Sequence, residues 1–301
     1  MKKIMLVSLL LTVAVATQAQ LGRKIAPQLV KGTSKTFVGK TVTEAAGQNT
    51  VTLTSEDKYT VTDVTADGYI IDVITTDMHS NAAADDLSGQ MLTMVQQLLK
   101  GVNFRVATDK DGKPLRIVNA DELKPQLDKA AQTVVDDMYQ RMPQLSQNLP
   151  KENMLQKIKE ELSPDKLVGN LLKSTSVMAL NGKTIMTGAQ ESITNEDGLK
   201  LKRMYFINGD NVTTSSNLDM TKDELKAVIL AQLEQMLPAD QLTMVKQNID
   251  QLMDSGMLKL DVKETASYEL AADGWVKALK SEVVTDNAGQ QSKITYEATC
   301  K

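Results

Sequence analysis

The alternation of apolar and polar residues predicts strands in the early part of this chain. Four runs there are rich in Val, Thr, Ile and Tyr, which suit a pleated surface with one buried face. The runs are Thr36 to Lys40, Thr50 to Thr54, Tyr59 to Thr65 and Tyr69 to Thr75. We therefore expect a β-rich block that begins near residue 36.

Six Asp-Gly or Asn-Gly pairs punctuate the chain, and most are flanked by strand-like runs. A type I′ hairpin turn needs a positive φ at both central residues, and these pairs meet that need at low cost. The pairs are Asp67-Gly68, Asp111-Gly112, Asn181-Gly182, Asp197-Gly198, Asn208-Gly209 and Asp273-Gly274. SVMAL precedes Asn181, and KTIM follows Gly182. This punctuation predicts an antiparallel meander.

Five segments repeat apolar residues at the three- and four-residue spacing of an amphipathic helix. They run from Leu87 to Leu99, Leu123 to Met142, Met154 to Leu162, Leu225 to Met236 and Leu242 to Met253. Each has one apolar face, which must be buried and most simply lies on the sheet. The predicted fold is α+β: a curved antiparallel β-sheet, a meander or half-barrel, with five or six amphipathic helices packed on it.

Two of these helices start with the same capping sequence. Asn119 lies three residues before Glu122, and Thr221 lies three before Glu224, as a capping box requires. Both sequences continue as Asp-Glu-Leu-Lys, and both helices are followed by Leu-Pro and a second helix. The order suggests an internal duplication with repeats at about 36–173 and 174–301, although the unequal spacing leaves chance as the alternative.

The first residues have the pattern of a secretory signal peptide. Lys2 and Lys3 precede the apolar run Ile4 to Ala16, and Ala19 supplies a small residue for cleavage. The run is shorter than the roughly 20 apolar residues that span a bilayer. We expect a signal peptide over 1–19, a flexible lead-in over 20–35 and a single α+β domain over 36–301. The protein is then exported to the periplasm or the medium, and it is soluble after cleavage.

Charge and composition narrow the classes of function. The chain has 34 Lys and Arg against 38 Asp and Glu, whereas nucleic-acid-binding proteins usually present a basic face. Cys300 is the lone cysteine and forms no internal disulfide or cysteine-based metal site. His79 is the lone histidine, so a zinc site would lack most of its usual ligands, and histidine-based acid–base catalysis would depend on this one residue. We expect no cofactor, no metal and no nucleic-acid partner; the oligomeric state is open.

Three groups have the residue types of a site. The DKDG stretch at Asp109–Gly112 contains two carboxylates, but a calcium loop needs ligands spaced over about twelve residues, so a turn is the better interpretation. Asp77, His79 and Ser80 contain the types of a catalytic triad, but neighbours in an extended segment point to opposite sides, so we expect a surface loop. The acid pairs Asp136-Asp137 and Glu160-Glu161 are interpreted as solvated helix faces.

Methionine is frequent, with 16 residues, while aromatic residues are 3% of the chain. Methionine fills irregular space and is common on adaptable binding surfaces. An apolar pocket between sheet and helices is predicted to be lined by Met91, Met94, Met138, Met142, Met154, Met236 and Met253. An ordinary helix–sheet core that uses methionine is the alternative. Trp275, beside a turn, is interpreted as a packing residue.

The order of these features resembles that of a family. A signal sequence, a strand meander, amphipathic helices and a closing strand pair with Gly274-Trp275 resemble uncharacterised exported proteins of Gram-negative bacteria, classed as domains of unknown function. The order of elements is also similar to that of periplasmic lipoprotein carriers, whose curved antiparallel sheet wraps helices around an apolar pocket. No diagnostic motif carries this second resemblance, and it assigns no role to any residue.

These observations favour a non-enzymatic exported envelope protein that binds a lipid, another apolar ligand or a lipidated partner. The alternative is a structural or interaction protein of the envelope with a filled core. A hydrolase is a third hypothesis, and it would need acids gathered around His79 in a cleft.

Overall fold

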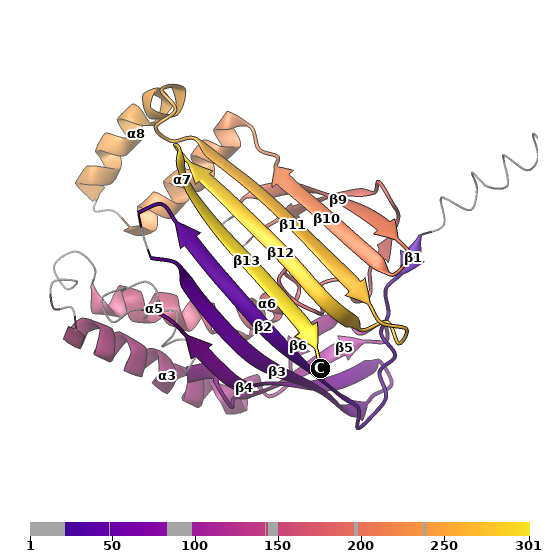
Figure 1. Ribbon diagram of the computed structural model, residues 1–301. Helices are drawn as coiled ribbons and strands as arrows, with labels where there is room; N and C mark the ends of the chain where they lie inside the picture. Colours follow the sequence, from indigo (N-terminus) through magenta and orange to yellow (C-terminus); the bar gives the residue numbers. More distant parts are fainter. Residues whose placement is uncertain are drawn as a thin grey trace, which may run out of the picture.

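The structure is a computed structural model, and it describes residues 22–47, 49–82, 98–141, 143, 150–195, 198–236 and 239–301. Within these ranges, one open antiparallel sheet of eleven strands and five helices make up an α+β fold (Figure 1). This confirms the fold class that the sequence predicts. Two shorter strands, β1 (Arg23–Lys24) and β7 (Thr184–Ile185), pair separately.

The eleven strands follow the order β6-β5-β4-β3-β2-β13-β12-β11-β10-β9-β8 across the sheet. Their bounds are β2 (Ser34–Ala45), β3 (Val51–Val64), β4 (Gly68–Ser80), β5 (Asn103–Asp109), β6 (Pro114–Ile117), β8 (Gln190–Thr194), β9 (Lys200–Asn208), β10 (Asn211–Leu218), β11 (Leu260–Leu270), β12 (Val276–Asn287) and β13 (Gln290–Cys300). Two meanders therefore meet where β13 pairs with β2, from Cys300 opposite Phe37 to Ser292 opposite Ala45.

The helices are α3 (Ala120–Arg141), α5 (Lys151–Glu161), α6 (Pro164–Leu171), α7 (Lys222–Met236) and α8 (Ala239–Asp254). Four predicted helices are confirmed, whereas α6 is an addition. The helix predicted over 87–99 lies outside the described residues except for its last two, which are helical. No helix in the described ranges is long and apolar enough to cross a membrane.

The helices lie on one side of the sheet, which we call the inner face (Figure 1). Leu123 and Leu127 of α3 pack on Val106 of β5 and Ile117 of β6. At the other wing of the sheet, Leu225 of α7 belongs to one cluster with strand residues of β9 and β11. The two helix groups therefore cover opposite wings of the inner face.

A buried segment, residues 174–181, covers the remaining end of the inner face; we call it the plug. Val177, Met178, Ala179 and Leu180 belong to the main apolar core. SVMAL is thus not a strand, contrary to its apolar pattern, and Asn181-Gly182 does not join two strands of the sheet. Successive turns supply the backbone hydrogen bonds of the plug, for example from Ala179 N to Ser176 O. A short apolar run that is covered on all sides shows no alternation, so its pattern cannot distinguish a strand from turns.

Hairpins of the sheet occur at four of the predicted pairs, Asp67-Gly68, Asp111-Gly112, Asn208-Gly209 and Asp273-Gly274, but their turn geometry differs from the prediction. Asp197 lies outside the described residues. Asp67-Gly68 connects β3 to β4 with neither residue at positive φ, and at Asp111-Gly112 only the glycine has positive φ. Positive φ at both central residues, the type I′ requirement, occurs at Ala288 (52°) and Gly289 (85°), between β12 and β13. Alanine rarely adopts this conformation, so the sequence did not single out this turn.

Two strands are longer than predicted. β3 joins the runs at 50–54 and 59–65 through the charged segment 55–58. This segment pairs with β2 on one side and β4 on the other, and Asp57 accepts hydrogen bonds from Ser55 Oγ (2.9 Å) and Thr75 Oγ1 (2.6 Å). β4 continues to Ser80, so the loop predicted at 77–80 is wrong.

The predicted lead-in is described from residue 22 on. Residues 22–33 include β1, and Ile25 and Leu29 are buried in the main core. The flexible lead-in over 20–35 stays a prediction. The signal-peptide prediction lies outside the described residues. The suggested duplication stays a prediction.

The two predicted capping boxes have different outcomes. Thr221 Oγ1 accepts a hydrogen bond from Glu224 N (3.3 Å), and Glu224 Oε2 accepts one from Thr221 N (2.9 Å), which is the reciprocal box. The side chain of Asn119 instead bridges to β5, where it accepts from Arg105 N and donates to Asn103 O. The Asn119 side chain therefore makes contacts with β5 instead of capping α3, and the capping box predicted for Asn119 and Glu122 is wrong.

Candidate functional site on the inner face

A buried ion pair lies on the inner face. Arg203 of β9 and Glu264 of β11 are each 8% exposed, and Arg203 Nη2 donates to both carboxylate oxygens (3.0 and 3.1 Å). Between them, Ser216 of β10 accepts from Arg203 Nε (3.0 Å). The sheet register creates this arrangement, because Ser216 pairs with Arg203 on one side and Glu264 on the other.

The ion pair is held in a largely desolvated place. Burial acts to lower the pKa of Arg203, but Glu264, Tyr205 and Tyr268 together outweigh it, so the pKa is raised and the guanidinium stays charged. A buried charge is tolerated only when a partner and hydrogen bonds satisfy it. The pair therefore contributes no spare charge with which to bind an ionised ligand.

A second polar group adjoins the pair. Lys183 Nζ donates to Glu191 Oε1 (2.8 Å) and to the Tyr205 hydroxyl (2.9 Å), and that hydroxyl also bonds Glu191. Burial raises the pKa of Tyr205, and the bond to Glu191 raises it further. Burial acts to raise the pKa of Glu191, but Lys183, Tyr205 and Arg203 together more than offset this, and the pKa is lowered.

Two hydroxyls on the inner face have no hydrogen-bond partner among the described residues. They are Thr214 Oγ1 on β10 and Ser281 Oγ on β12, in residues that are 1% and 2% exposed. Ala266 of β11 lies between them, since it pairs with Thr214 on one side and Ser281 on the other. Most buried polar atoms in proteins have a partner. Both hydroxyls are enclosed on either side of Ala266, which is buried in the main apolar core.

The next row along the strands is partly open. Val283, Ile294 and Thr43 lie side by side on β12, β13 and β2, and they point to the same face as Ser281. Ile294 is 41% exposed, and Val283 and Thr43 are half-buried. Ile294 and Thr43 lie between the wings that the two helix groups cover, whereas Val283 packs against the cluster of α7, β9 and β11. It offers apolar surface to a ligand next to the two unpartnered hydroxyls.

A polar hollow of about 260 Å³ lies on the opposite, outer face. Its lining includes Asp261, Lys263, Glu282 and Asp286. Lys263 is 3.5 Å from Asp261, and Lys293 is 2.7 Å from Glu282, so these carboxylates are paired on an exposed surface. Such a lining does not suit an apolar ligand.

Only some of the methionines predicted to line an apolar pocket lie within the described residues. Met138 is buried on α3, Met154 packs in the cluster between α3 and α5, and Met253 packs with α7 and the opposite wing of the sheet. Met154 and Met253 thus belong to different clusters. Met91, Met94 and Met142, and the side chain of Met236, lie outside the described residues. The common pocket stays a prediction.

The DKDG stretch is a turn, as predicted. Asp109 Oδ1 accepts hydrogen bonds from the backbone N of Asp111 and of Lys113, both at 2.9 Å, and Asp111 pairs with Lys24 (2.7 Å). The first carboxylate therefore builds the β5–β6 hairpin. Trp275 is a packing residue, as predicted: it is buried in the main core, and its ring meets Tyr59 edge-on.

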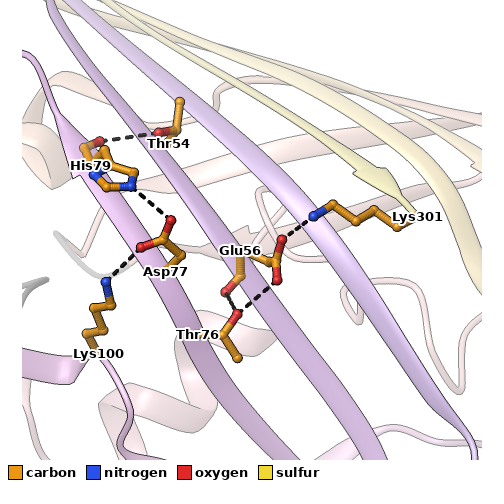
Figure 2. Close-up of polar contacts among 7 residues, drawn as sticks. All are labelled: Thr54, Glu56, Thr76, Asp77, His79, Lys100 and Lys301. Atoms are coloured by element: carbon orange, nitrogen blue, oxygen red, sulfur yellow. Dashed lines mark hydrogen bonds and ion pairs between the residues drawn. The ribbon is translucent and has the colours of Figure 1, made fainter.

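Asp77, His79 and Ser80 do not form a triad. Asp77 and His79 lie on the outer face of β4, where His79 Nε2 is 2.8 Å from Asp77 Oδ2 and Lys100 Nζ is 2.7 Å from Asp77 Oδ1 (Figure 2). Ser80 points to the opposite side, and its Oγ accepts from Ala82 N (3.1 Å). Nearby, Glu56 contacts Thr76 and Lys301 (Figure 2). The acid pairs in α3 and α5 likewise face solvent, and Asp136 pairs with Lys151.

Asp77 gives a pH-dependent prediction. The hydrogen bond from Lys100, and then that from Met78 N, lower the pKa of Asp77 from 3.8 to about 2. Since folding lowers this pKa, its stabilising effect is present above the unfolded pKa and is lost as the pH falls through about 2. In Lys100→Met we expect the Asp77 titration midpoint, followed by carbonyl NMR, to rise toward 3.8. An unchanged midpoint would show that Lys100 does not hold this carboxylate in solution.

Sequence reasoning missed the buried ion pair, although a signal was present. In β9, Leu201, Arg203 and Tyr205 share one side of the strand, and in β11, Glu264 lies between Val262 and Ala266 on one side. A charge at an otherwise apolar inward position is the signal. The two unpartnered hydroxyls had no such signal, because Thr and Ser are common on either face of a strand.

The comparisons with known proteins give little further information. No family model matches this chain, and none of the curated proteins matches it. A solved structure titled "Lipid-protein interactions in lipovitellin" is similar over 91% of this chain and 25% of that chain, with a TM-score of 0.42 and 11% sequence identity. The chain thus spans about a quarter of that protein's length. At this TM-score the similarity assigns neither function nor ligand.

Proposed function

We propose that this protein is a non-enzymatic exported protein that binds a lipid or another apolar ligand on the inner face of its sheet. The carrying observation is the open row of Val283, Ile294 and Thr43. Ile294 and Thr43 lie on middle strands of the sheet, and Val283 borders the wing whose inner side chains α7 helps to bury.

The burial pattern supports this location. Beside this row, Val262 is buried on β11 and Val51 is buried on β3, whereas Ile294 of the middle strand β13 is not. An apolar ligand laid on this row would remove apolar area from water, worth about 25 cal/mol per Å². The polar seam of Arg203, Ser216 and Glu264 continues the row toward β9 and would limit the apolar contact on that side.

Two further observations support the remaining parts of the proposal. The residues that most resemble catalytic groups, His79 and Ser80, point to opposite faces of β4, which favours a binding role over hydrolysis. Export is supported by the pattern of Lys2, Lys3, the apolar run and Ala19.

Native mass spectrometry with a matched pair of variants tests the proposal. Ile294→Arg places a charge on the inner face of β13, whereas Val38→Arg places one on the outer face of the adjacent β2. The two residues are equally exposed, at 41% and 39%, so the variants differ mainly in the face that they change. We expect protein from its host's envelope to carry a mass of lipid size that organic extraction removes. Ile294→Arg should lose this mass, and Val38→Arg should keep it.

Other results would contradict the proposal. A bare protein mass that ignores added lipids would favour a structural or interaction protein with a filled core. Loss of the ligand in both variants would place the binding surface elsewhere. Circular dichroism on both variants checks that each is folded.

A further inference from the structure

The two edges of the eleven-stranded sheet differ in how they are protected. At one edge, Leu167 and Leu171 of α6 pack in one cluster with Ile117 of β6. β6 also begins with Pro114, which has no backbone N–H to offer a further strand. At the other edge lies β8, which contains no proline, lysine or arginine and pairs with β9 on one side. Of the two edges, β8 is therefore the one that can accept another strand.

The backbone groups of β8 alternate between β9 and the open side. Asn195 N, one residue beyond β8, donates to Leu199 O. Because the direction of these groups alternates along a strand, Ile193 and Glu191 also direct theirs toward β9. The residues between them direct their N–H and C=O groups to the open side, where these groups have no hydrogen-bond partner among the described residues. These residues, all exposed, are Gln190, Ser192 and Thr194.

A second copy of β8 matches this edge in one antiparallel register. Ser192 then lies opposite Thr194 of the second copy, and the two residues exchange two backbone hydrogen bonds. A two-fold axis repeats this exchange, so the pair gains four hydrogen bonds. Ile193 lies on the axis, opposite the same residue of the second copy, in a position where side chains approach closely. Ile193 packs in one cluster with Val228 of α7, so apolar surface continues to this edge.

The other registers are less favourable. A pair centred on Ser192 sets Ile193 beside Glu191 of the second copy, and a pair centred on Glu191 sets two carboxylates opposite each other, which is destabilising. In the register centred on Ile193, Glu191 lies beside Asn195 of the second copy. It keeps its own ion pair with Lys183 (2.8 Å), so no unmatched charge is buried.

The charges of the outer face permit this pairing. Lys202 of β9 lies opposite Ser192, and Lys200 lies opposite Thr194. Across the pair, Lys202 and Lys200 of the second copy are three strand spacings apart, or about 14 Å. This distance exceeds the screening length of about 8 Å at physiological ionic strength. Lys200 is moreover paired with Glu224 (2.5 Å), so repulsion between the copies is small.

We propose that two copies of this protein pair through β8, antiparallel and centred on Ile193, so that their sheets join with both inner faces on the same side. The paired strand has five residues in each copy, which is a small interface. We therefore expect a weak dimer, with a dissociation constant on the order of 10–100 µM. The pairing is independent of the proposed ligand, because the open row lies on β12, β13 and β2.

Sedimentation equilibrium with two substitutions at one position tests the pairing. Ser192→Pro removes a backbone N–H that β9 does not use, so the chain should still fold, as circular dichroism checks. Two of the four hydrogen bonds between the copies are lost, so dimerisation should weaken at least about tenfold. Ser192→Ala keeps the N–H and should dimerise as wild type does. Protein concentrations run from well below to well above the expected dissociation constant.

Disulfide cross-linking tests the register. In a Cys300→Ser background the introduced thiol is the one cysteine of the chain. Ile193→Cys places the two thiols opposite each other on the axis, so oxidation should give a covalent dimer that a reductant reverses. Thr194→Cys, one residue away and more exposed, faces Ser192 of the second copy and should cross-link several-fold less.

Each outcome decides the matter. A wild-type protein that stays monomeric at all concentrations would overturn the proposal and leave this edge to a strand of another protein. A dimer that Ser192→Pro does not weaken would place the interface elsewhere. Stronger cross-linking of Thr194→Cys than of Ile193→Cys would overturn the register centred on Ile193. Lipid binding by wild type is measured separately and is unaffected by any of these results.

Discussion

Glu264→Gln is expected to lower the free energy of unfolding by about 3–5 kcal/mol, because it leaves the buried Arg203 without its counter-ion. Arg203 is 8% exposed and directs one terminal nitrogen to both Glu264 oxygens, so water cannot easily replace the lost charge. Urea denaturation followed by circular dichroism measures the change.

A matched control lies on the same strand. Glu269 of β11 pairs with Lys277 at 2.6 Å, but both side chains are exposed. Exposed ion pairs are worth about 0–1 kcal/mol, so Glu269→Gln should change stability by less than 1 kcal/mol. Equal effects of the two substitutions would contradict the claim that burial makes the Arg203–Glu264 pair important.

A double substitution tests the effect of removing both charges of the buried ion pair at once. In Arg203→Met/Glu264→Leu, both buried charges are absent and apolar groups take their volume. Replacement of a buried ion pair by packed apolar residues is often neutral or stabilising. We expect the double variant to regain most of the stability that Glu264→Gln loses. If it also lowers affinity for the apolar ligand, the pair shapes the binding face as well as the fold.

Tyr268→Ala is expected to destabilise the protein by about 3–5 kcal/mol. The Tyr268 side chain is fully buried in the main core, and its hydroxyl donates to the carbonyl oxygen of Ser174 (2.8 Å). It therefore ties the plug to β11 through both packing and a hydrogen bond. The free energy of unfolding in urea measures the total effect.

Tyr268→Phe isolates the hydrogen bond. This variant keeps the ring but leaves the Ser174 carbonyl unpaired, at a cost of about 1–2 kcal/mol. Hydrogen exchange at the plug amides, such as those of Ala179 and Asn181, should become faster in Tyr268→Phe than in wild type. Phe206→Ala, an outer-face substitution on β9 with a 44% exposed side chain, should leave plug exchange unchanged. If plug exchange is unaffected by Tyr268→Phe, the plug is held by its apolar contacts alone.

Several elements could be predicted because their determinants are local. The spacing of Leu123, Leu127, Ala131 and Val134 defines the buried face of α3, and all four are buried as the helical period requires. The Thr221–Glu224 box likewise depends only on atoms within one helical turn. Glycine and its neighbour mark where hairpins occur, even where the turn type differs.

Other features depend on contacts between distant residues. The SEDK segment, residues 55–58, has three charged residues, yet it pairs with β2 and β4, and Thr75 of β4 donates to Asp57. Asn119 caps no helix because Arg105 and Asn103 of β5 use its side chain. In both cases a partner supplied by the fold outweighs a local preference.

The sequence by itself determined four of the five described helices, several hairpin positions and the antiparallel character of the sheet, because hydrophobic period and turn chemistry act over a few residues. Only the tertiary structure decided that β13 pairs with β2, that 174–181 forms the plug, and that Arg203 meets Glu264 across β10. It also brought Thr214, Ala266 and Ser281 into one row. The physical reason is register: which side chains become neighbours across a sheet depends on the alignment of whole strands, and no short stretch of sequence contains that information.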